Sequence, residues 1–245
     1  MNRFTQKSVV VTGAASGIGA AIAAALAKEG ASVLWVDRAI EVVDVARSHG
    51  GIGLVGDVTD HELPEQVRDA VGSSGLDHLV GAAGVQVRTP AADMDEADWE
   101  RLLAVNLSGF YRLIRGLLPA LIDGSQGAPG SVLAVTSMSA DRAVPGIVPY
   151  GSVKAGLSHL IRGLAAELGP VGVRLNGIAP GYVATPMTAQ ILGDPQRLER
   201  IMGRLPLRRI AEPKDMVGPA IFLLSDDASY VTGQILAVDG GYAIT

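Results

Sequence analysis

The sequence contains no cysteine, and only 4% of its 245 residues are aromatic and 18% are charged. The absence of cysteine excludes disulfides, a thiolate nucleophile and Cys-ligated metals, and we expect a cytoplasmic protein in a reducing compartment. The four histidines include no pair at ligand spacing, so we expect no metal. The net charge of −5 argues against a broad nucleic-acid-binding surface, and we expect a small-molecule substrate instead.

Glycine, by contrast, is abundant: its 31 residues are roughly twice the usual share of about 7%. Even with the 13 prolines, the total stays below the share typical of low-complexity chains. The apolar residues are mainly alanine, valine, leucine and isoleucine, which suits helices packed on a buried sheet. At about 150 residues per domain, the length fits one large domain or two small ones. Because no linker or repeat divides the chain, we expect one domain, residues 1–245.

The stretch from Ser8 to Ala27 contains no charged residue and so imitates a secretory signal or a membrane span. Its internal order favours another structure, because the β-branched run Val9–Val11 is followed by three spaced glycines and then by an alanine-rich segment. We therefore expect a strand, a turn and a helix here, and no membrane association.

Apolar strand-like runs and helix-like stretches alternate along the whole chain. The expected strands are 8–12, 32–37, 53–56, 78–82, 131–136, 174–178 and 235–238. The expected helices are 17–29, 39–48, 62–73, 95–104, 106–122, 150–168 and 213–225. This alternation predicts an α/β fold, a single doubly wound Rossmann-type domain whose seven-stranded parallel sheet is flanked by helices on both faces. The connection 180–212, which contains four prolines, is expected to be a substrate-binding loop or lid.

A glycine pattern from Gly13 to Gly19 follows the first expected strand and opens the first expected helix. Such a turn brings a diphosphate close to backbone N–H groups at a helix start, where the helix dipole favours anions. Glycines that serve only the turn and helix–strand packing are the alternative. Asp37 lies 18 residues after Gly19, where a carboxylate can accept hydrogen bonds from the adenosine ribose. A carboxylate there repels a 2′-phosphate and favours NAD, whereas the adjacent Arg38 leaves NADP open.

Tyr150 and Lys154 stand at i and i+4, a spacing that places both side chains on one face of a helix. A phenol titrates near about 10 in isolation. An adjacent ammonium and a positively charged nicotinamide both favour the phenolate, so we expect them to lower this pKa. Such a tyrosine can protonate a carbonyl oxygen during hydride delivery or deprotonate an alcohol in the reverse direction. For an isolated Tyr-x-x-x-Lys, a surface pair is the alternative.

In this order, the Gly13–Gly19 turn, Ser137 and the Tyr150-x-x-x-Lys154 pair resemble the short-chain dehydrogenase/reductase family, and the resemblance covers the whole chain. Further matching motifs are Asp57-Val58, Asn106-Leu-Ser-Gly109, Pro180-Gly181, Thr185-Pro186 and Val238-Asp239-Gly240-Gly241. The chain departs from the family at Gly81-Ala82-Ala83-Gly84, where an Asn-Asn-Ala-Gly-like element is usual. That departure puts a structural hydrogen bond near the cofactor in doubt.

The resemblance implies an NAD-dependent oxidoreductase acting on a secondary alcohol or ketone, with Tyr150 as the acid/base. It implies that Ser137 hydrogen-bonds the substrate oxygen and that Lys154 holds the nicotinamide ribose and lowers the pKa of Tyr150. It also implies that Asn106 holds a water that relays protons; without the resemblance, Asn106 is most simply a helix cap. The implied cofactor-binding residues are Gly13, Ser16, Gly17, Ile18, Gly19, Asp37, Asp57, Val58, Ala83, Gly84, Tyr150, Lys154, Pro180, Gly181, Val183 and Thr185.

The substrate-binding residues that we expect are Ser137, Ser139, Tyr150 and Tyr182. Gln86, Val144 and the 184–206 loop complete the expected pocket wall, with Arg88 and Arg142 as anion selectors; the identity of the substrate is not predicted. The resemblance also implies a homotetramer or homodimer formed through the helices at 106–122 and 150–168.

Two other functions stay open. One is a 3-oxoacyl-carrier-protein reductase-like enzyme that uses NADPH, against which Asp37 argues. The other is a non-catalytic dinucleotide-binding sensor or scaffold, against which the presence of both Tyr150 and Lys154 argues.

Overall fold

The computed structural model describes residues 3–72 and 75–245, and its centre is a seven-stranded sheet in which every pair of neighbouring strands is parallel. The strand order is β3-β2-β1-β4-β5-β6-β7. The strands are β1 (Ser8–Thr12), β2 (Ser32–Asp37), β3 (Ile52–Val55), β4 (His78–Gly81), β5 (Ser131–Val135), β6 (Arg174–Pro180) and β7 (Ile235–Val238). The chain winds outward from β1 to β3, returns to the other side of β1, and continues to β7. This confirms the predicted doubly wound fold, with its topological switch point between β1 and β4.

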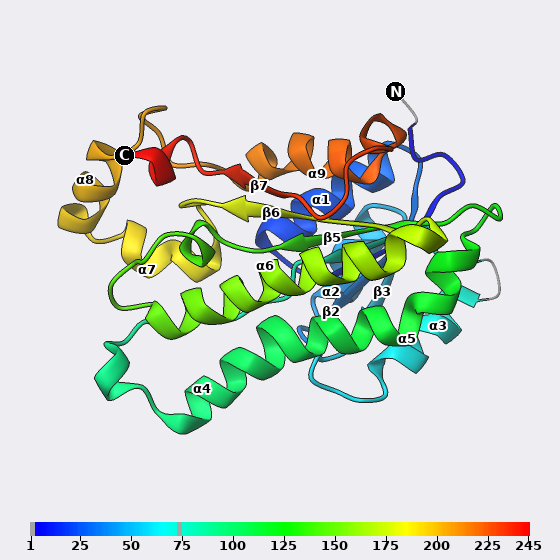
Figure 1. The fold of residues 1–245 in the computed structure, drawn as a ribbon, viewed down its shortest axis with the longest axis horizontal. Coiled ribbons are helices and arrows are strands. Elements are labelled where there is room, and N and C mark those ends of the chain that lie inside the picture. Colours follow the sequence, from blue (N-terminus) through cyan, green and yellow to red (C-terminus); the bar gives the residue numbers. More distant parts are fainter. Residues whose placement is uncertain (1–2, 73–74) are drawn as a thin grey trace.

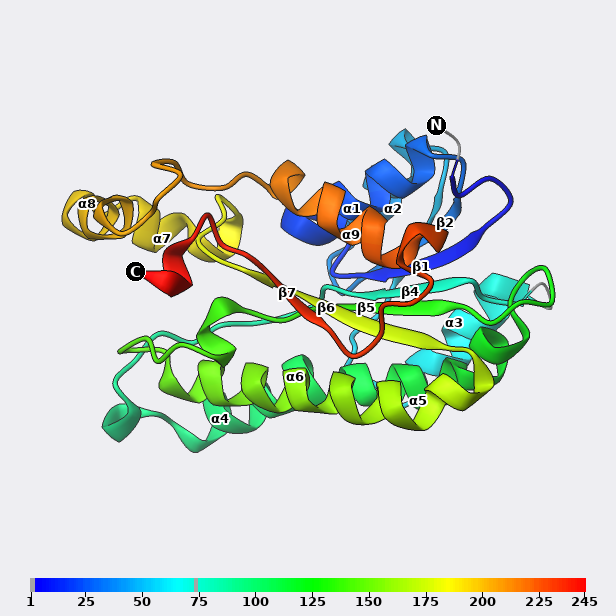
Figure 2. The ribbon, with the colours of Figure 1, turned by 45° about the horizontal axis from the view of Figure 1, so that its top comes forward.

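Helices cover both faces of the sheet, as Figure 2 shows. One face carries α1 (Gly17–Lys28), α2 (Val42–Ser48) and α9 (Val217–Leu224). The other carries α3 (Leu63–Val71), α4 (Glu96–Leu103), α5 (Gly109–Asp123) and α6 (Val148–Leu168). Two short helices, α7 (Ala189–Leu192) and α8 (Pro195–Gly203), lie with the C-terminus at one end of the molecule (Figures 1 and 2).

The central strands are apolar on both faces because each face supports its own core. In β1, Val9 and Val11 pack into the core beneath α1 and α9, while Val10 packs into the core formed with α3, α5 and α6. All three side chains are almost completely buried. Such continuous apolar runs are typical of parallel strands covered on both faces. The uncharged stretch that imitates a membrane span is therefore β1 followed by α1.

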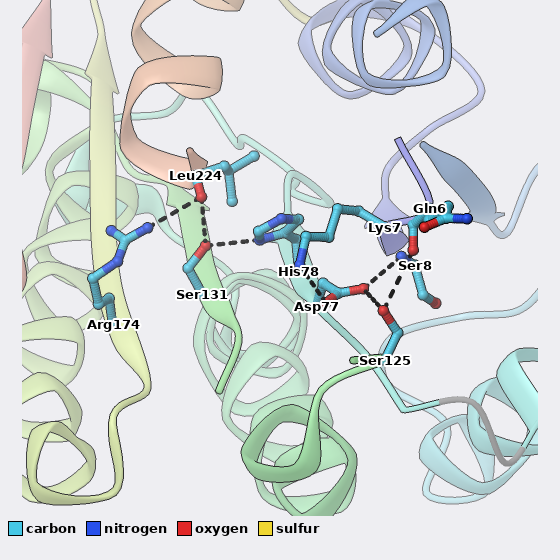
Figure 3. Close-up of polar contacts among 9 residues, drawn as sticks. All are labelled: Gln6, Lys7, Ser8, Asp77, His78, Ser125, Ser131, Arg174 and Leu224. Carbon is cyan, nitrogen blue, oxygen red and sulfur yellow. Dashed lines mark hydrogen bonds and ion pairs between the residues drawn. The ribbon is translucent and has the colours of Figure 1, made fainter. Parts of the chain in front are cut away.

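Polar contacts close the amino-terminal edge of the sheet (Figure 3). His78 and Ser131 are the first residues of β4 and β5, and the His78 Nδ1 atom lies 2.9 Å from the Ser131 hydroxyl oxygen. That hydroxyl donates to the Leu224 carbonyl at the end of α9, at 3.2 Å. The hydroxyl hydrogen is thereby used, so His78 is the donor and carries its proton on Nδ1. Arg174, the first residue of β6, also donates to the Leu224 carbonyl, at 3.1 Å.

On the same edge, the buried Asp77 carboxylate ties the start of β1 to the segment after α5. It accepts from the Ser8 backbone N–H at 2.7 Å and from the Ser125 hydroxyl, and it pairs with Lys7 at 3.2 Å. These contacts leave the opposite edge, where the strands end, as the open side of the sheet.

Several helical boundaries differ from the sequence-based prediction. The helices expected at 39–48, 150–168 and 213–225 are Val42–Ser48, Val148–Leu168 and Val217–Leu224. The helices expected at 95–104 and 106–122 are joined by a π-helical turn, Ala104–Ser108, so that the chain does not break between α4 and α5. The connection 180–212 lacks a strand, as predicted, but contains α7 and α8. The helix expected at 62–73 ends at Val71, and residue 73 lies outside the described residues.

Within residues 3–72 and 75–245, the structure contains neither a helix long and apolar enough to cross a membrane nor a metal-binding group of acidic, histidine or cysteine side chains.

Candidate active site

A cleft with a volume of about 560 Å³ lies at the carboxyl ends of the strands. Open parallel sheets bind ligands at this edge, beside the switch point, and the volume lies in the range of roughly 300–1,000 Å³ that small-molecule sites occupy. Most of the residues expected to bind cofactor or substrate line it. They are Gly13, Ser16, Gly17, Ile18, Gly19, Asp37, Gly84, Ser137, Ser139, Tyr150, Lys154, Pro180, Gly181, Tyr182, Val183 and Thr185.

One wall of the cleft is the turn between β1 and α1. Gly13 has a positive φ of 68°, and a Cβ atom there would lie 2.7 Å from the backbone of Ala82. A Cβ atom on Gly19 would overlap the Gly13 carbonyl group. Ser16, the residue before α1, makes no side-chain capping hydrogen bond. The first N–H groups of a helix have no intrahelical acceptor, so this uncapped helix start offers them to an anion.

Asp37 ends β2 beside this turn. One of its carboxylate oxygens accepts from the Ala15 backbone N–H and the other from the Ala39 N–H, both at 3.0 Å. The two bonds hold the carboxylate at the cleft wall, beside the exposed Arg38.

The remaining cofactor residues of the prediction, Asp57, Val58 and Ala83, line an adjoining hollow of about 100 Å³ that shares Gly13 and Asp37 with the main cleft. The guanidinium of Arg112, on α5, donates to the carbonyls of Val58 and Thr59, both at 3.1 Å. Arg112 therefore fixes the floor of this hollow. Sequence reasoning missed it, because its acceptors lie more than 50 residues earlier in the chain and carry no motif.

Tyr150 and Lys154 both lie on α6 and are buried at the cleft. The Lys154 ammonium donates to the Val135 carbonyl at 2.9 Å and lies 5.8 Å from the centroid of the Tyr150 ring. Burial raises the pKa of Tyr150 to about 12, whereas a hydrogen bond with Ser137 acts to lower it. Burial also lowers the pKa of Lys154 to about 8. The chain by itself thus raises the pKa of Tyr150, whereas from the sequence we expected the neighbouring charges to lower it.

Ser137 follows β5, in reach of the same tyrosine. Its hydroxyl oxygen lies 2.8 Å from that of Ser139 and accepts the Ser139 backbone N–H at 3.1 Å. Ser139, also expected to bind substrate, is the more buried of the two serines, and its hydroxyl and N–H hold the Ser137 hydroxyl.

Asn106 does not line the cleft but lies directly behind it, in the π-helical turn. Its side-chain amide donates to the carbonyls of Val85 and Leu102, both at 3.0 Å, and its oxygen accepts the Val85 N–H at 3.3 Å. Asn106 is therefore no helix cap. π-Helical turns inside longer helices are frequent at functional sites, and this one aims an amide at the strand-end loop. A Cβ atom on Gly84 in that loop would lie 2.9 Å from the Asn106 oxygen.

The opposite wall comes from the segment after β6. The Thr188 hydroxyl donates to the Val183 carbonyl and lies 3.2 Å from the Thr185 hydroxyl, so it braces both predicted residues. Thr188 also lines the cleft, and no motif identified it.

The structure corrects part of the expected substrate wall. Gln86, Arg88, Ser139 and Tyr182 line the cleft, whereas Val144 and Arg142 do not. Val144 packs in the apolar cluster with Ile147 and Tyr150. Arg142 donates to the Ala243 carbonyl at 2.7 Å instead. Further lining residues that the sequence did not suggest are Arg101, Ile147 and Ile191.

Comparisons with known proteins cover almost the whole chain. A family model described as enoyl-(acyl carrier protein) reductase matches residues 13–243. Galactitol 2-dehydrogenase (L-tagatose-forming) of Cereibacter sphaeroides is 37% identical over 248 residues, which cover 99% of this chain and 97% of the relative. The 3-oxoacyl-[acyl-carrier-protein] reductase FabG of Thermotoga maritima is 35% identical over 251 residues, covering 99% of this chain and all of the relative.

Solved structures superpose closely as well. A crystal structure described as a putative NAD(P)-dependent gluconate 5-dehydrogenase from Beutenbergia cavernae, with bound NADP, has a TM-score of 0.93 at 38% identity and covers 100% of this chain and 99% of its own. A 7α-hydroxysteroid dehydrogenase complexed with NADH and 7-oxo glycochenodeoxycholic acid has a TM-score of 0.91 at 34% identity, covering 98% of this chain and 95% of its own.

Proposed function

The chain belongs to the short-chain dehydrogenase/reductase family, and from this premise we propose that it transfers a hydride between NAD(H) and a secondary alcohol or ketone. The observation that carries the proposal is the meeting of Ser137, Tyr150 and Lys154 in the cleft that begins at the glycine turn. The names of relatives such as galactitol 2-dehydrogenase support the same reaction class.

The residues present fit a nicotinamide dinucleotide. The glycine turn leaves room where a Cβ atom on Gly13 or Gly19 would clash, and the uncapped start of α1 suits a diphosphate. The hollow at Asp57 and Val58 adjoins this turn and would take the adenine, held in shape by Arg112. NAD⁺, when bound, supplies the hydride acceptor and a positive charge beside the phenol.

Tyr150 would move the proton at its phenolic oxygen. In alcohol oxidation it takes the hydroxyl proton, and in ketone reduction it returns one to the carbonyl oxygen. Its burial excludes water but raises its pKa to about 12, so the nearby charges must favour the phenolate. Ser137 would hold the reacting oxygen with its hydroxyl and stabilise the charge that develops there.

Lys154 would supply one of those charges and would bind the nicotinamide ribose. It donates to the Val135 carbonyl, which directs its ammonium along the cleft wall. Asn106 lies behind Gly84 and would hold the loop after β4 in place, with the relay water that the family resemblance implies on its cleft side.

NAD is the cofactor that we propose over NADP. Both oxygens of Asp37 accept backbone N–H groups, which holds a negative charge at the end of β2, where a 2′-phosphate would be repelled. The similar structures include one with NADP and one with NADH, so the cofactor must be decided on this chain's own residues.

We propose further that residues 1–245 form one catalytic unit and that 180–212 is its substrate-binding lid. This segment contains α7 and α8, and its residues Tyr182, Thr185 and Thr188 line the cleft. A homotetramer or homodimer formed through α5 and α6 is proposed as well, as the family resemblance implies; Tyr111 of α5 and Val148 of α6 are exposed large hydrophobic residues on these helices. Light scattering coupled to size-exclusion chromatography measures the assembly.

The test of the function is a screen of NAD⁺ and NADP⁺ reduction by secondary alcohols. The panel contains sugar alcohols, hydroxysteroids, cyclic alcohols and hydroxy acids, and it includes analogues with and without a carboxylate where these are available. We expect NAD⁺-dependent turnover of at least one class. A parallel assay follows NADPH oxidation with a 3-oxoacyl thioester; activity in that assay alone would favour the reductase alternative, to which the relative from Thermotoga maritima belongs. Cofactor binding without turnover of any substrate would support a sensor.

A further inference from the structure

The lining of the cleft carries more positive than negative charge. Among the lining residues that the structure describes, Arg38, Arg88, Arg101 and Lys154 are cationic, against one carboxylate. The one carboxylate of the lining, Asp37, lies at the far end beside the glycine turn and accepts two backbone N–H groups. In a chain of net charge −5, this concentration of positive charge calls for a ligand.

We propose that Arg88 forms a subsite for a carboxylate of the substrate, so that the preferred substrates are hydroxy acids and the corresponding oxo acids. This proposal names the substrate class of the proposed oxidoreductase, so its prediction about turnover rests on the proposed function. A guanidinium presents paired N–H donors that match both oxygens of a carboxylate, which makes such contacts strong and directional.

The surroundings of Arg88 support this role. It stands in the loop between β4 and α4 and is half-buried, yet no acidic side chain or carbonyl in the described part of the chain accepts from its guanidinium. Burial lowers the pKa of Arg88, the nearby Arg197 cation acts in the same direction, and Tyr182 acts against them. A guanidinium does not escape this cost by losing its proton, so a carboxylate that pairs with it relieves the desolvated charge.

The neighbouring cations are differently placed. Arg197 is already paired with Asp194 at 3.1 Å. Arg142 donates to the Ala243 carbonyl and lies 5.8 Å from the centroid of the Tyr242 ring, outside the cleft lining. Three arginines of the lining, Arg38, Arg88 and Arg101, have guanidinium groups without a partner among the described residues. Arg38 and Arg101 are exposed to solvent, so Arg88 is the one of the three whose unpaired charge is partly buried.

Tyr182 lies beside Arg88 but does not supply a negative charge to it. Its ring packs edge-on against Tyr242, with 5.2 Å between centroids, and it lines the cleft. Burial, together with the charge of Tyr242 and a hydrogen bond with it, raises the pKa of Tyr182 to about 12, so this phenol keeps its hydrogen at neutral pH.

The experiment compares matched pairs of alcohols that differ in charge: 4-hydroxycyclohexanecarboxylate with its carboxamide, and 3-hydroxybutanoate with its amide. For the wild type, we expect that in at least one of the two pairs kcat/KM for the acid exceeds kcat/KM for the amide by at least about tenfold. Arg88→Gln should bring this ratio close to one, mainly through a higher KM for the acid. Arg88→Lys should retain part of the preference, and Arg142→Gln should retain all of it.

A binding measurement makes the test independent of turnover. Cyclohexanecarboxylate and cyclohexanecarboxamide are titrated calorimetrically into the wild type and Arg88→Gln, each saturated with NADH. Circular dichroism first verifies that both proteins are folded. We expect the acid to bind the wild type more tightly than the amide and to lose this advantage in Arg88→Gln. No preference in either assay, or a preference that survives Arg88→Gln, would overturn the subsite. Selective acid binding without turnover of any alcohol would keep the subsite and reject the proposed function.

Discussion

The ammonium nitrogen of Lys154 lies 5.8 Å from the centroid of the Tyr150 ring, one helical turn along α6. Burial affects both groups: it raises the pKa of Tyr150 to about 12 and lowers that of Lys154 to about 8. An ammonium that is charged below about pH 8 favours the phenolate in a site where burial opposes it.

Replacing Lys154 tests this coupling. Lys154→Met should reduce kcat by at least about 100-fold, the lower range for a general acid–base contribution. For the wild type, the rate of ketone reduction should fall as the pH rises through about 8, because the ammonium loses its proton there. Stopped-flow kinetics across pH 6–10 measures both effects, with Lys28→Met on the surface of α1 as control. Wild-type rates in Lys154→Met would contradict the assigned role.

Asp37 should decide between the two cofactors. Asp37→Asn removes the negative charge but keeps an oxygen that accepts a backbone N–H. Like charges in contact cost several kcal/mol, so we expect the NADP-to-NAD ratio of kcat/KM to rise by at least about tenfold. Steady-state kinetics with both cofactors provides the ratio. Asp44→Asn, on exposed α2, is the matched control. An unchanged ratio would remove Asp37 from cofactor selection.

The glycine turn should not tolerate a methyl group at Gly19. A Cβ atom there overlaps the Gly13 carbonyl, so Gly19→Ala should lower stability by about 1–3 kcal/mol and weaken NAD binding. Gly163→Ala is the matched control, because it lies inside α6 with open space around its Cβ position. That variant should be neutral or more stable by about 0.5–1 kcal/mol. Urea unfolding and NAD titration measure the pair, and equal effects would contradict the packing.

His78 should make the fold sensitive to acid. Burial lowers its pKa from 6.5 to about 4. Between these values the unfolded chain binds a proton that the folded chain does not. The free energy of unfolding therefore decreases as the pH is lowered, by up to about 3 kcal/mol. We measure the free energy of unfolding by urea at pH 7.5, 6.0 and 5.0. The slope of this free energy against pH should be shallower for His78→Gln than for the wild type. The exposed His61→Gln should keep the wild-type slope, and equal slopes in all three would refute the assignment.

The sheet and much of the site could be predicted because both depend on local patterns. Apolar runs such as Val9–Val11 define strands, and the turn at Gly13 and the Tyr150–Lys154 spacing carry their chemistry within a few residues. Parallel strands place their carboxyl ends at one edge, so motifs far apart in the chain meet there.

The rest depends on contacts between distant segments. Arg112 reaches carbonyls more than 50 residues away, and no local pattern marks such a bond. The sequence offered Arg88 and Arg142 equally, whereas packing turns one into the cleft and the other toward Ala243. The π-helical turn at Asn106 was missed because its extra residue interrupts the 3.6-residue period by which helices are recognised.

The central claim is that Tyr150 is the acid/base, and Tyr150→Phe tests it most directly, with the fully exposed Tyr230→Phe as control. The measurement is kcat for NAD⁺ reduction with the best alcohol of the screen, together with the NAD Kd of the same preparations. We predict that kcat falls by roughly 10²–10⁴-fold in Tyr150→Phe while the Kd stays within about threefold. A Tyr150→Phe enzyme with wild-type kcat would contradict the account.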